Sequence, residues 1–385
     1  MNIDVGIIGA GPAGLFAANL LVRAGIGCAV FERLSEDGVR ARTRAGLIEA
    51  RTASLLERHG LAGGMLSRGS TSSACEFRRG GVRHVFEYAA LAGACHRVYP
   101  QQLLVADLID ALRAAGGTLF FGHEVTALGP AGQPEIRLAT GQDVRCRFVL
   151  GCDGFHGIAR RALEGADCSG VDFGAEWLVL LAQSPPSSDH TVYGLHPAGF
   201  AGHMLRSPTV SRFYLQVEPD SHAEDWPEDR VWDELGQRLA AQGVGPRRGP
   251  VIERSTLRLH SCVTEPMQKD CIFLAGDAAH IVTPAGGKGM NLALQDADEL
   301  VSGLLDHFRG GDDTRLHAYS RTRLQAVWRA VEFSHWMLDL LLARPTQGRF
   351  REGLRDARLA RLLEDKDFAR HFAANFVGIE VPRPA

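Results

Sequence analysis

The sequence lacks several features that would assign a chain to a class at once. Its 385 residues carry a formal net charge of only -3, so no overall basic field points to nucleic acid or an anionic membrane. It has no low-complexity run and no internal repeat. No apolar stretch is long enough to cross a bilayer, and the N-terminus lacks the basic region of a signal peptide. We therefore expect a cytoplasmic protein with neither a nucleic-acid nor a membrane partner.

The cysteines also lack the spacing of a metal site or a disulfide framework. None of them forms a C-x-x-C pair; they are Cys28, Cys75, Cys95, Cys146, Cys152, Cys168, Cys262 and Cys271. We expect mostly buried thiols in a reducing compartment. No set of histidines and carboxylates is spaced to hold a metal, so no metal is expected either.

What is present is typical of a globular protein long enough for two domains. The chain is 45% hydrophobic and 23% charged. Its 44 glycines exceed the usual share, which suggests close approaches between backbone and ligand.

The N-terminal segment "DVGIIGAGPAGLFAANLLVRAGIGCAVFER" is the most informative stretch. A short apolar strand over 5–8 is followed by Gly9, Gly11 and Gly14, then by a helical pattern and a second apolar strand that ends at Glu32. In such a fingerprint the glycines make the turn, admit a pyrophosphate and let the helix pack on the strand, and the acid accepts from ribose hydroxyls. The acid favours FAD or NAD over NADP. The alternative is a glycine-rich turn in some other α/β protein.

Two further apolar strands favour FAD. "RFVLGCDGFHGIARRAL" ends its strand at Asp153, and "FLAGDAAHIVTPAGGKGMN" ends its strand at Asp277 and continues through three more glycines. In a parallel sheet these ends meet at the carboxyl edge, where ligands bind. An acid there can hold a ribityl chain, and the glycines leave room for a flavin ring. Three unrelated turns are the alternative.

The sequence resembles the single-component, FAD-dependent flavoprotein aromatic hydroxylases. The resemblance covers nearly the whole chain through "GIIGAGPAG", "RTRAGLIE", "CDGFHGIAR", "FYLQV", "EPMQ", "GDAAHIVTPAGGKGMNLA" and "NFVGI", several of them specific to the hydroxybenzoate-using subgroup. It implies a Rossmann-like α/β FAD-binding domain of the glutathione-reductase type, a mixed-sheet substrate domain and C-terminal helices. The implied boundaries give the FAD domain residues 1–70 and 101–165, the substrate domain 71–100 and 166–267, and the last FAD segment with the helices 268–385.

The resemblance also implies the chemistry. In this family reduced FAD and O2 form a flavin C4a-hydroperoxide, which transfers OH to an activated aromatic ring, and the protein positions the ring and excludes water. The electron donor is NADPH or NADH. Glu36 and Asp37 would repel a 2′-phosphate whereas Arg40 and Arg42 would attract it, which favours NADPH slightly.

Matching positions suggest the site residues. The FAD or nucleotide contacts implied are Gly9, Gly11, Gly14, Glu32, Arg33, Arg42, Arg44, Gln102, Asp153, His156, Asp277, Lys288, Gly289 and Asn291. Arg206 and Tyr214 match residues that hold the substrate carboxylate, which an arginine fork suits. Arg212 matches an arginine that governs flavin movement, Pro284 a proline whose carbonyl faces the substrate, and Tyr193 the tyrosine that takes the phenolic proton. Without the flanking match, Arg206 would be taken for a surface strand arginine.

Three departures concern the substrate. Met204 stands where a carboxylate-binding serine is expected, Phe376 replaces the second tyrosine of a phenol relay, and Ser72 falls near the relay's surface end. Loss of that hydroxyl interrupts proton transfer from Tyr193. An electron-rich ring such as 3-amino-4-hydroxybenzoate needs less deprotonation, so it and 4-hydroxybenzoate both remain candidates, the former in a biosynthetic context such as antibiotic biosynthesis.

Other classes fit less well. A FAD oxidase or dehydrogenase would not need Arg206, Tyr214 and Tyr193, and the W-x-W-x-I-P stretch of flavin halogenases is missing. A non-catalytic FAD-binding sensor is the remaining alternative. The pattern over 315–342 predicts a helix that is mainly core and that contributes to a homodimer contact.

Overall fold

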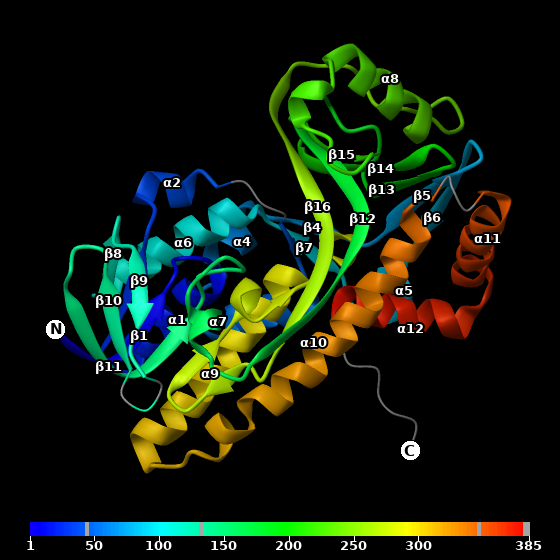
Figure 1. The fold of residues 1–385 in the computed structure, drawn as a ribbon. Coiled ribbons are helices and arrows are strands. Elements are labelled where there is room, and N and C mark those ends of the chain that lie inside the picture. Colours follow the sequence, from blue (N-terminus) through cyan, green and yellow to red (C-terminus); the bar gives the residue numbers. More distant parts are fainter. Residues whose placement is uncertain (43–45, 131, 133, 345–347, 380–385) are drawn as a thin grey trace. The chain divides into compact units, whose positions relative to one another are not determined.

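A computed structural model describes residues 1–42, 46–130, 132, 134–344 and 348–379. The chain divides into two compact units. Unit 1 comprises Met1–Ser70, Arg97–Val171 and Ser261–Glu332, and unit 2 comprises Thr71–His96, Asp172–His260 and Phe333–Ala385. Figure 1 traces the chain by colour.

Unit 1 is built on the expected parallel sheet. The strands are β1 (Asn2–Ile8), β2 (Cys28–Glu32), β8 (Thr118–Phe121), β11 (Asp143–Gly151), β17 (Gln268–Lys269) and β18 (Ile272–Leu274), in the order β17-β18-β11-β1-β2-β8. The pairings from β18 to β8 are parallel, and β9 (Val125–Leu128) and β10 (Glu135–Leu138) add an antiparallel extension on β11. The ends of β1, β11 and β18 are therefore neighbours at one sheet edge, as predicted from the sequence.

Helices cover this sheet because apolar side chains fill both of its faces. Helix α1 (Pro12–Arg23) packs against α6 (Gln101–Ala114) and α9 (Gly289–Gly310), visible in Figure 1 in blue, cyan and yellow. Shorter elements are α2 (Glu36–Arg40), α3 (Ala50–Arg58), α4 (Gly63–Arg68), α7 (Ala159–Ala162), β3 (Leu47–Ile48), β4 (Ser70–Ser72), β7 (His96–Val98) and β19 (His280–Ile281). The core includes Ile7, Leu15, Phe16, Leu108 and Leu300.

Unit 2 contains the expected mixed sheet. Its strands β5 (Cys75–Arg79), β6 (Val82–Phe86), β13 (Thr191–His196), β14 (Gly199–Ser207) and β15 (Val210–Val217) follow one another in the order β15-β14-β13-β5-β6, and β12 (Asp167–Ala182) pairs with β15. Alternate residues point to opposite faces. One face packs its apolar residues, among them Leu180, Phe213 and Leu215, against α8 (Glu228–Leu239). The other face carries the candidate substrate residues.

Two long strands connect the units. Strand β12 enters unit 2 and β16 (Val251–Glu265) returns from it, and they are neighbours in the sheet, as the green ribbons of Figure 1 show. Helices α5 (Tyr88–Ala92), α11 (Gly348–Glu364) and α12 (Lys366–Val377) belong to unit 2, and α10 (Thr314–Leu341) runs from unit 1 into it.

Helix α10 confirms the helix predicted over 315–342 but corrects part of its description. Phe333 and Met337 are buried, whereas the Trp328 ring is 44% exposed and its indole nitrogen donates to Glu265 Oε1 at 2.6 Å. This part of the helix is amphipathic rather than wholly core. Among the described helices, none is long and apolar enough to span a membrane.

The cysteine prediction is wrong for one pair. Cys168 on β12 and Cys262 on β16 form a disulfide, with their Cα atoms 6.2 Å apart. The pair is separated by 94 residues, so only the pairing of the two long strands brings it together. The remaining cysteines of the chain are free, and Cys28 and Cys75 among them are buried as expected.

Candidate active site

The glycine loop after β1 has the shape that the fingerprint demands. Gly9 has φ +102°, and a Cβ there would lie 2.4 Å from the Cys152 carbonyl oxygen, so no other residue fits. A Cβ on Gly14 would lie 2.1 Å from the Gly9 oxygen, which lets α1 pack closely on the loop. A Cβ on Gly11 would meet nothing within 4 Å among the described atoms. The loop thus leaves open space at the N-terminus of α1.

Glu32 holds this loop from the neighbouring strand. Its Oε2 accepts from the Ala10 amide at 2.8 Å, and its Oε1 accepts from the Leu34 amide at 2.9 Å. Each carboxylate oxygen retains acceptor capacity after one hydrogen bond. The side chain is therefore oriented and still able to accept from ribose hydroxyls.

Asp153 follows β11 at the same sheet edge. Its Oδ2 accepts from the amides of Ile158 and Ala159, at 2.7 and 3.0 Å, and caps the short helix α7. Its Oδ1 is buried, and no partner for it exists among the residues that the structure describes. Burial raises the pKa of this carboxyl, against the effect of the backbone hydrogen bonds. The neighbouring His156 side chain is exposed.

Asp277, after β18, is exposed, and its loop is held by a buried charge cluster that the sequence did not reveal. Asp296 Oδ2 accepts from the Gly276 amide at 3.0 Å and lies 2.7 Å from His280 Nε2. Its Oδ1 accepts from Arg323 Nε at 2.7 Å. Burial would raise the pKa of Asp296, but the His280 ring and Arg323 outweigh it and lower the pKa to about 2. The cluster fixes the turn that presents Asp277.

The loop and helix start after Asp277 are likewise tied to the protein. Lys288 Nζ donates to Glu49 Oε1 at 2.6 Å in a pair whose side chains are both 6% exposed. Asn291 accepts from the Glu49 amide at 2.9 Å and donates to the carbonyls of Leu47 and Gly287 at 3.1 and 2.9 Å. The positive charge of Lys288 is thus paired, and the cofactor roles of Lys288 and Asn291 stay predictions.

Two backbone features complete this segment. The Pro284 carbonyl accepts from the Gly287 amide at 3.1 Å within a one-turn 3-10 helix. A Cβ on Gly289, the first residue of α9, would meet nothing within 4 Å in the described part of the chain. Space is therefore open at the start of α9, as at the start of α1.

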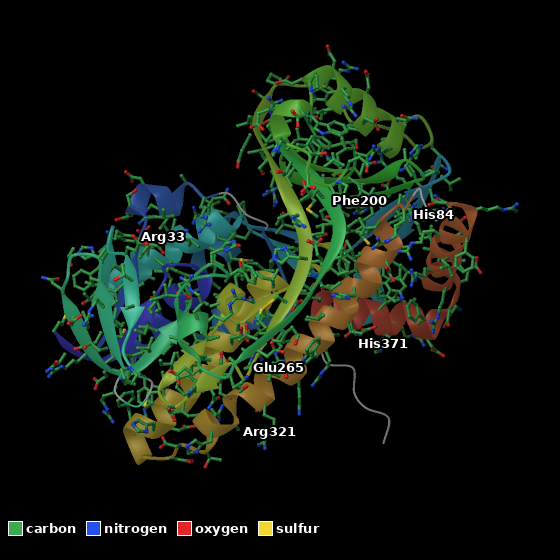
Figure 2. All side chains as sticks on the ribbon, viewed as in Figure 1. Arg33, His84, Phe200, Glu265, Arg321 and His371 are labelled. Carbon is green, nitrogen blue, oxygen red and sulfur yellow. A yellow bond between two sulfur atoms is a disulfide. The ribbon has the colours of Figure 1, made fainter. Side chains whose placement is uncertain are left out.

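The nucleotide candidates near α2 differ in their partners. Arg40 donates to Glu36 at 2.9 Å and to Asp110, so its charge is compensated. Arg33, labelled in Figure 2, and Arg42 are exposed, and no described side chain pairs with either. Arg44 lies outside the described residues.

Gln102, at the start of α6, has a buried side-chain oxygen for which the described residues provide no partner. Unit 1 thus contains the groups that can bind a dinucleotide. They are the Gln102 oxygen, the open glycine loop, Glu32 and Asp153 Oδ1. The residues present therefore fit FAD.

On unit 2, register places the candidate substrate residues on one sheet face. Tyr193 on β13 lies opposite Gly202 on β14, and Gly202 lies opposite Tyr214 on β15. One row further, Met204 lies opposite Arg212. Two residues along β14, Arg206 has the same facing, because side chains in a strand alternate with a period of two. The face therefore combines rings and cations.

Aromatic rings that sequence reasoning missed surround these positions. Trp177 lies 4.7 Å from Phe200 and 5.5 Å from Tyr214 between ring centroids, and Phe77 stacks on Tyr193 at 5.3 Å. Figure 2 labels Phe200 within the sheet. A Cβ on Gly202 would lie 2.9 Å from the Phe200 ring, so this glycine admits the ring. Each of these rings lies on a different strand, so their common facing follows from the strand register, which the sequence does not give.

The two arginines on this face have unsatisfied donors. Arg206 Nη2 and Arg212 Nε are buried, and neither has a hydrogen-bond partner in the described parts of the chain. No carboxylate among the described residues forms an ion pair with either guanidinium, although Arg212 lies 5.6 Å from the centre of the Tyr214 ring. Burial, followed by the nearby Arg212, lowers the pKa of Arg206 below its ordinary value. A buried cation without a counter-ion is costly, and an anionic ligand would remove that cost.

Tyr193 is 3% exposed, and burial raises the pKa of its hydroxyl well above the ordinary value. No hydrogen bond to this hydroxyl is present within the described residues. Its donor and acceptor are thus left for a ligand.

Phe376 lies in an aromatic cluster of unit 2. Its ring centroid is 5.1 Å from Tyr88 and 4.8 Å from His96, and its carbonyl lies 2.9 Å from His96 Nε2. The Tyr88 hydroxyl donates to Ser72, at 2.6 Å to the carbonyl and 2.8 Å to Oγ. Phe376 and Ser72 are therefore joined through Tyr88, which sequence reasoning did not single out. No group of His, Cys, Asp or Glu in the described residues could hold a metal ion.

Comparisons with known proteins identify the family and the fold. The model of the FAD binding domain family matches residues 2–334. The chain is 36% identical to p-hydroxybenzoate hydroxylase of Acinetobacter baylyi, over 98% of this chain and 96% of the relative. It is similar to the OxyS anhydrotetracycline hydroxylase structure from Streptomyces rimosus, with TM-score 0.78 and 26% identity over 100% of this chain and 77% of that one. It also shares the fold of p-nitrophenol 4-monooxygenase PnpA from Pseudomonas putida, with TM-score 0.83 and 23% identity over the full length of both chains.

Proposed function

Because the chain belongs to the FAD binding domain family and is a flavoprotein aromatic hydroxylase within it, we propose that it hydroxylates a hydroxybenzoate-type aromatic acid. The proposed co-substrates are O2 and a reduced nicotinamide cofactor. Cytoplasmic location and a homodimer stay predictions.

The observation that carries the proposal is the pair of uncompensated arginines on the sheet face of unit 2. Arg206 Nη2 and Arg212 Nε are buried without a described partner. A guanidinium with a free nitrogen pair meets the two oxygens of a carboxylate in a bidentate contact. Arg206 would therefore bind the acid group, and Trp177, Phe200 and Tyr214 would contact the ring.

Tyr193 would handle the opposite end of the substrate. The hydroxyl of this buried tyrosine has both hydrogen-bonding functions available, and burial of the residue disfavours ionisation by raising the pKa. It can donate a hydrogen bond to a phenolate oxygen, which stabilises the deprotonated, electron-rich form of the ring, or accept a hydrogen bond from a phenol. We assign Pro284 a carbonyl contact with the substrate, as the family resemblance implies.

Unit 1 would hold FAD. The open glycine loop at α1 suits the pyrophosphate, Glu32 the ribose, and Asp277 the ribityl chain, while Asp153 and Gln102 contribute unpartnered oxygens. When bound, FAD supplies the redox chemistry, taking electrons from the nicotinamide cofactor and activating O2. The protein's part is to orient the ring and exclude water.

We favour NADPH as the electron donor. Arg40 and Arg113 pair with Glu36 and Asp110, so these four charges balance. Among the described residues near α2, the exposed charges left are Arg33, Arg42 and the acid Asp37. These leave a local excess of one positive charge, which attracts a 2′-phosphate.

Two acids remain candidates for the substrate. The relatedness to p-hydroxybenzoate hydroxylase favours 4-hydroxybenzoate, whereas Phe376 and Met204 favour a more electron-rich ring such as 3-amino-4-hydroxybenzoate. Phe376 offers no hydroxyl to pass a proton onward, and an amino-substituted ring depends less on that transfer.

The test is a competition assay. Purified enzyme with FAD, NADPH and air is given an equimolar mixture of both acids, and the products are identified by mass spectrometry. Hydroxylation of either acid with matching NADPH consumption supports the function, and the preferred acid identifies the substrate. NADPH oxidation without hydroxylated product for any hydroxybenzoate would instead indicate an oxidase, and no acid-dependent NADPH oxidation at all would indicate a sensor.

A variant tests the choice between the two acids. In the same competition assay, Phe376→Tyr should shift the preference toward 4-hydroxybenzoate. An unchanged ratio of the two products would contradict the argument from the proton relay.

A further inference from the structure

The disulfide between Cys168 and Cys262 lies beside the cofactor loop of unit 1. Both cysteines and the loop Cys152–Arg160 belong to this unit. Cys168 is exposed to solvent, whereas Cys262 is 5% exposed. A soluble thiol therefore has access to Cys168 and not to Cys262.

Strands β12 and β16 approach each other closely beside the disulfide. Gly170, two residues after Cys168, has no room for a side chain, because its Cβ would lie 2.6 Å from the Ser261 carbonyl oxygen and 3.3 Å from Cys262 Cα. The glycine thus permits β12 and β16 to approach at the point where the cysteines meet. The two sulfurs are the covalent link between strands that are otherwise 94 residues apart.

A guanidinium is directed at the sulfurs. Arg160 Nη1 lies 3.1 Å from Cys168 Sγ and 3.7 Å from Cys262 Sγ. A positive charge at this distance stabilises a thiolate, and a better leaving thiolate accelerates thiol–disulfide exchange. The charge is therefore placed where it assists opening of the bridge.

The same guanidinium reaches the cofactor loop. Arg160 Nη2 donates to the Phe155 carbonyl at 2.9 Å, and its charged end lies 4.2 Å from the centre of the Phe155 ring. Phe155 lies in the loop whose ends are joined by the hydrogen bonds from Ile158 and Ala159 to Asp153. A Cβ on Gly9 would lie 3.1 Å from Asp153 Cα, so the loop borders the glycine turn. One contiguous set of contacts therefore joins the two cysteine sulfurs, Arg160, Phe155 and Asp153.

We propose that Cys168 and Cys262 are a reversible redox site, opened by dithiol reductants and coupled through Arg160 to the loop that borders the FAD site. A thiolate of the reductant attacks Cys168 Sγ, the bond between the sulfurs breaks, and Cys262 leaves as a thiolate beside Arg160. The second thiol of the reductant then attacks the mixed disulfide and frees Cys168. The reductant becomes a disulfide, and its two electrons and two protons pass to the cysteine pair.

Opening the bridge changes what Arg160 contacts. A thiolate attracts the guanidinium more strongly than a disulfide sulfur does, so Arg160 shifts away from the Phe155 carbonyl. The loop that carries Asp153 then loses one of its supports. Reduced protein should bind FAD about tenfold more weakly than oxidised protein, a ratio within the usual range for coupled sites.

The first experiment follows the bridge chemistry on the full-length holoenzyme. Native protein is treated with increasing dithiothreitol, alkylated with iodoacetamide and mapped by mass spectrometry. Cys168 and Cys262 should be alkylated after mild reduction and protected before it, while buried Cys28 and Cys75 stay unmodified throughout. Alkylation of Cys168 without reductant, or resistance of the pair until the protein unfolds, would overturn the proposal.

Variants then test the role of Arg160. Arg160→Met should slow opening of the disulfide by dithiothreitol about tenfold, since the leaving thiolate loses its cation. Arg161→Met, a change at the exposed neighbour, should leave the opening rate unchanged.

The affinity for FAD tests the coupling. The dissociation constant of apoprotein for FAD, measured by flavin fluorescence, should differ between oxidised and reduced wild type. It should not respond to dithiothreitol in the Cys168→Ser/Cys262→Ser variant. Equal constants for both wild-type forms would refute the coupling to FAD, and equal opening rates for the two arginine variants would refute the role of Arg160.

Discussion

The candidate sites of the two units leave different buried atoms without a described partner: oxygens of Asp153 and Gln102 in unit 1, and nitrogens of Arg206 and Arg212 in unit 2. In unit 1, Glu32, Asn291 and Asp296 each make two or more hydrogen bonds to the protein itself. On the sheet face of unit 2, Arg206 and Arg212 keep buried nitrogens without described partners. Most of the candidate cofactor side chains of unit 1 are thus held in place by the protein itself, whereas unit 2 has buried positive charge that an anionic ligand would compensate.

This difference separates a site of general use, for a nucleotide, from a site for a particular substrate. A dinucleotide cradle can be the same for many reactions, because glycines and helix ends recognise phosphates in general. A sheet face with two cations and several rings suits the aromatic anion that we propose as the substrate. The substrate is therefore to be sought in unit 2, and four changes test the contrast in order of expected effect.

The largest effect is expected from breaking the buried pair of unit 1. Lys288→Met leaves the Glu49 carboxylate buried without its cation, which should lower the free energy of unfolding by about 3–5 kcal/mol. Urea denaturation measures the change. Lys269→Met, which removes a surface pair with Glu164, is the matched control and should cost less than about 1 kcal/mol. Equal losses would mean that the buried pair is not a structural element.

The next effect concerns Arg206 in unit 2. Arg206→Met removes a buried, uncompensated charge, so the protein should lose no stability, while KM for the aromatic acid should rise about 100-fold. Steady-state kinetics and thermal denaturation measure the two quantities. Arg230→Met, at an exposed arginine stacked on Trp226, is the control and should leave both KM and stability nearly unchanged. A destabilised Arg206 variant with an unchanged KM would reverse the contrast between the units.

A smaller effect should appear in acid. The pKa of Asp296 is lowered from 3.8 to about 2 in the folded protein, so its ionised form stabilises the fold above pH 4. That contribution, about 2 kcal/mol, is lost as the pH falls from 4 to 2, where the carboxyl becomes protonated. The difference in unfolding free energy between wild type and Asp296→Asn should shrink over this range. A difference that is independent of pH would show that the charge of Asp296 does not support the turn before Asp277.

The smallest effect is expected at the exposed nucleotide residues. Arg42→Gln should reduce the ratio of kcat/KM for NADPH to that for NADH about fivefold, because exposed charge contacts are worth about 1 kcal/mol or less. Arg58→Gln on α3 removes an equally exposed arginine and should leave the ratio unchanged. If both variants behave alike, Arg42 does not read the 2′-phosphate.

Local patterns predicted much of unit 1 from the sequence. Gly9, Gly14 and Glu32 lie within one strand–helix–strand segment, so their spacing alone implies the turn that the structure contains. The meeting of three strand ends at the carboxyl edge of a parallel sheet was predicted from their similar sequences, whereas the order of the strands was not.

Long-range pairings were beyond the sequence. Asp296 and Arg323 are separated by 27 residues and the bridged cysteines by 94, and only the folded chain brings each pair together. Trp177 and Phe200 lie on the substrate face because of the strand register. The turn residues and the alternation of apolar residues in the sequence do not determine that register. The predicted positive charge of Lys288 was found paired, because Glu49 comes from a distant segment.

The most direct test of the contrast is the binding of an acid and its uncharged analogue. The dissociation constants of 4-hydroxybenzoate and methyl 4-hydroxybenzoate are measured from flavin absorbance changes, in wild type and in Arg206→Met. The wild type should bind the acid about 100-fold more tightly than the ester, since the carboxylate satisfies the buried guanidinium, and the variant should bind both alike. Equal affinities for acid and ester in the wild type would contradict the claim that unit 2 is built to receive an aromatic carboxylate.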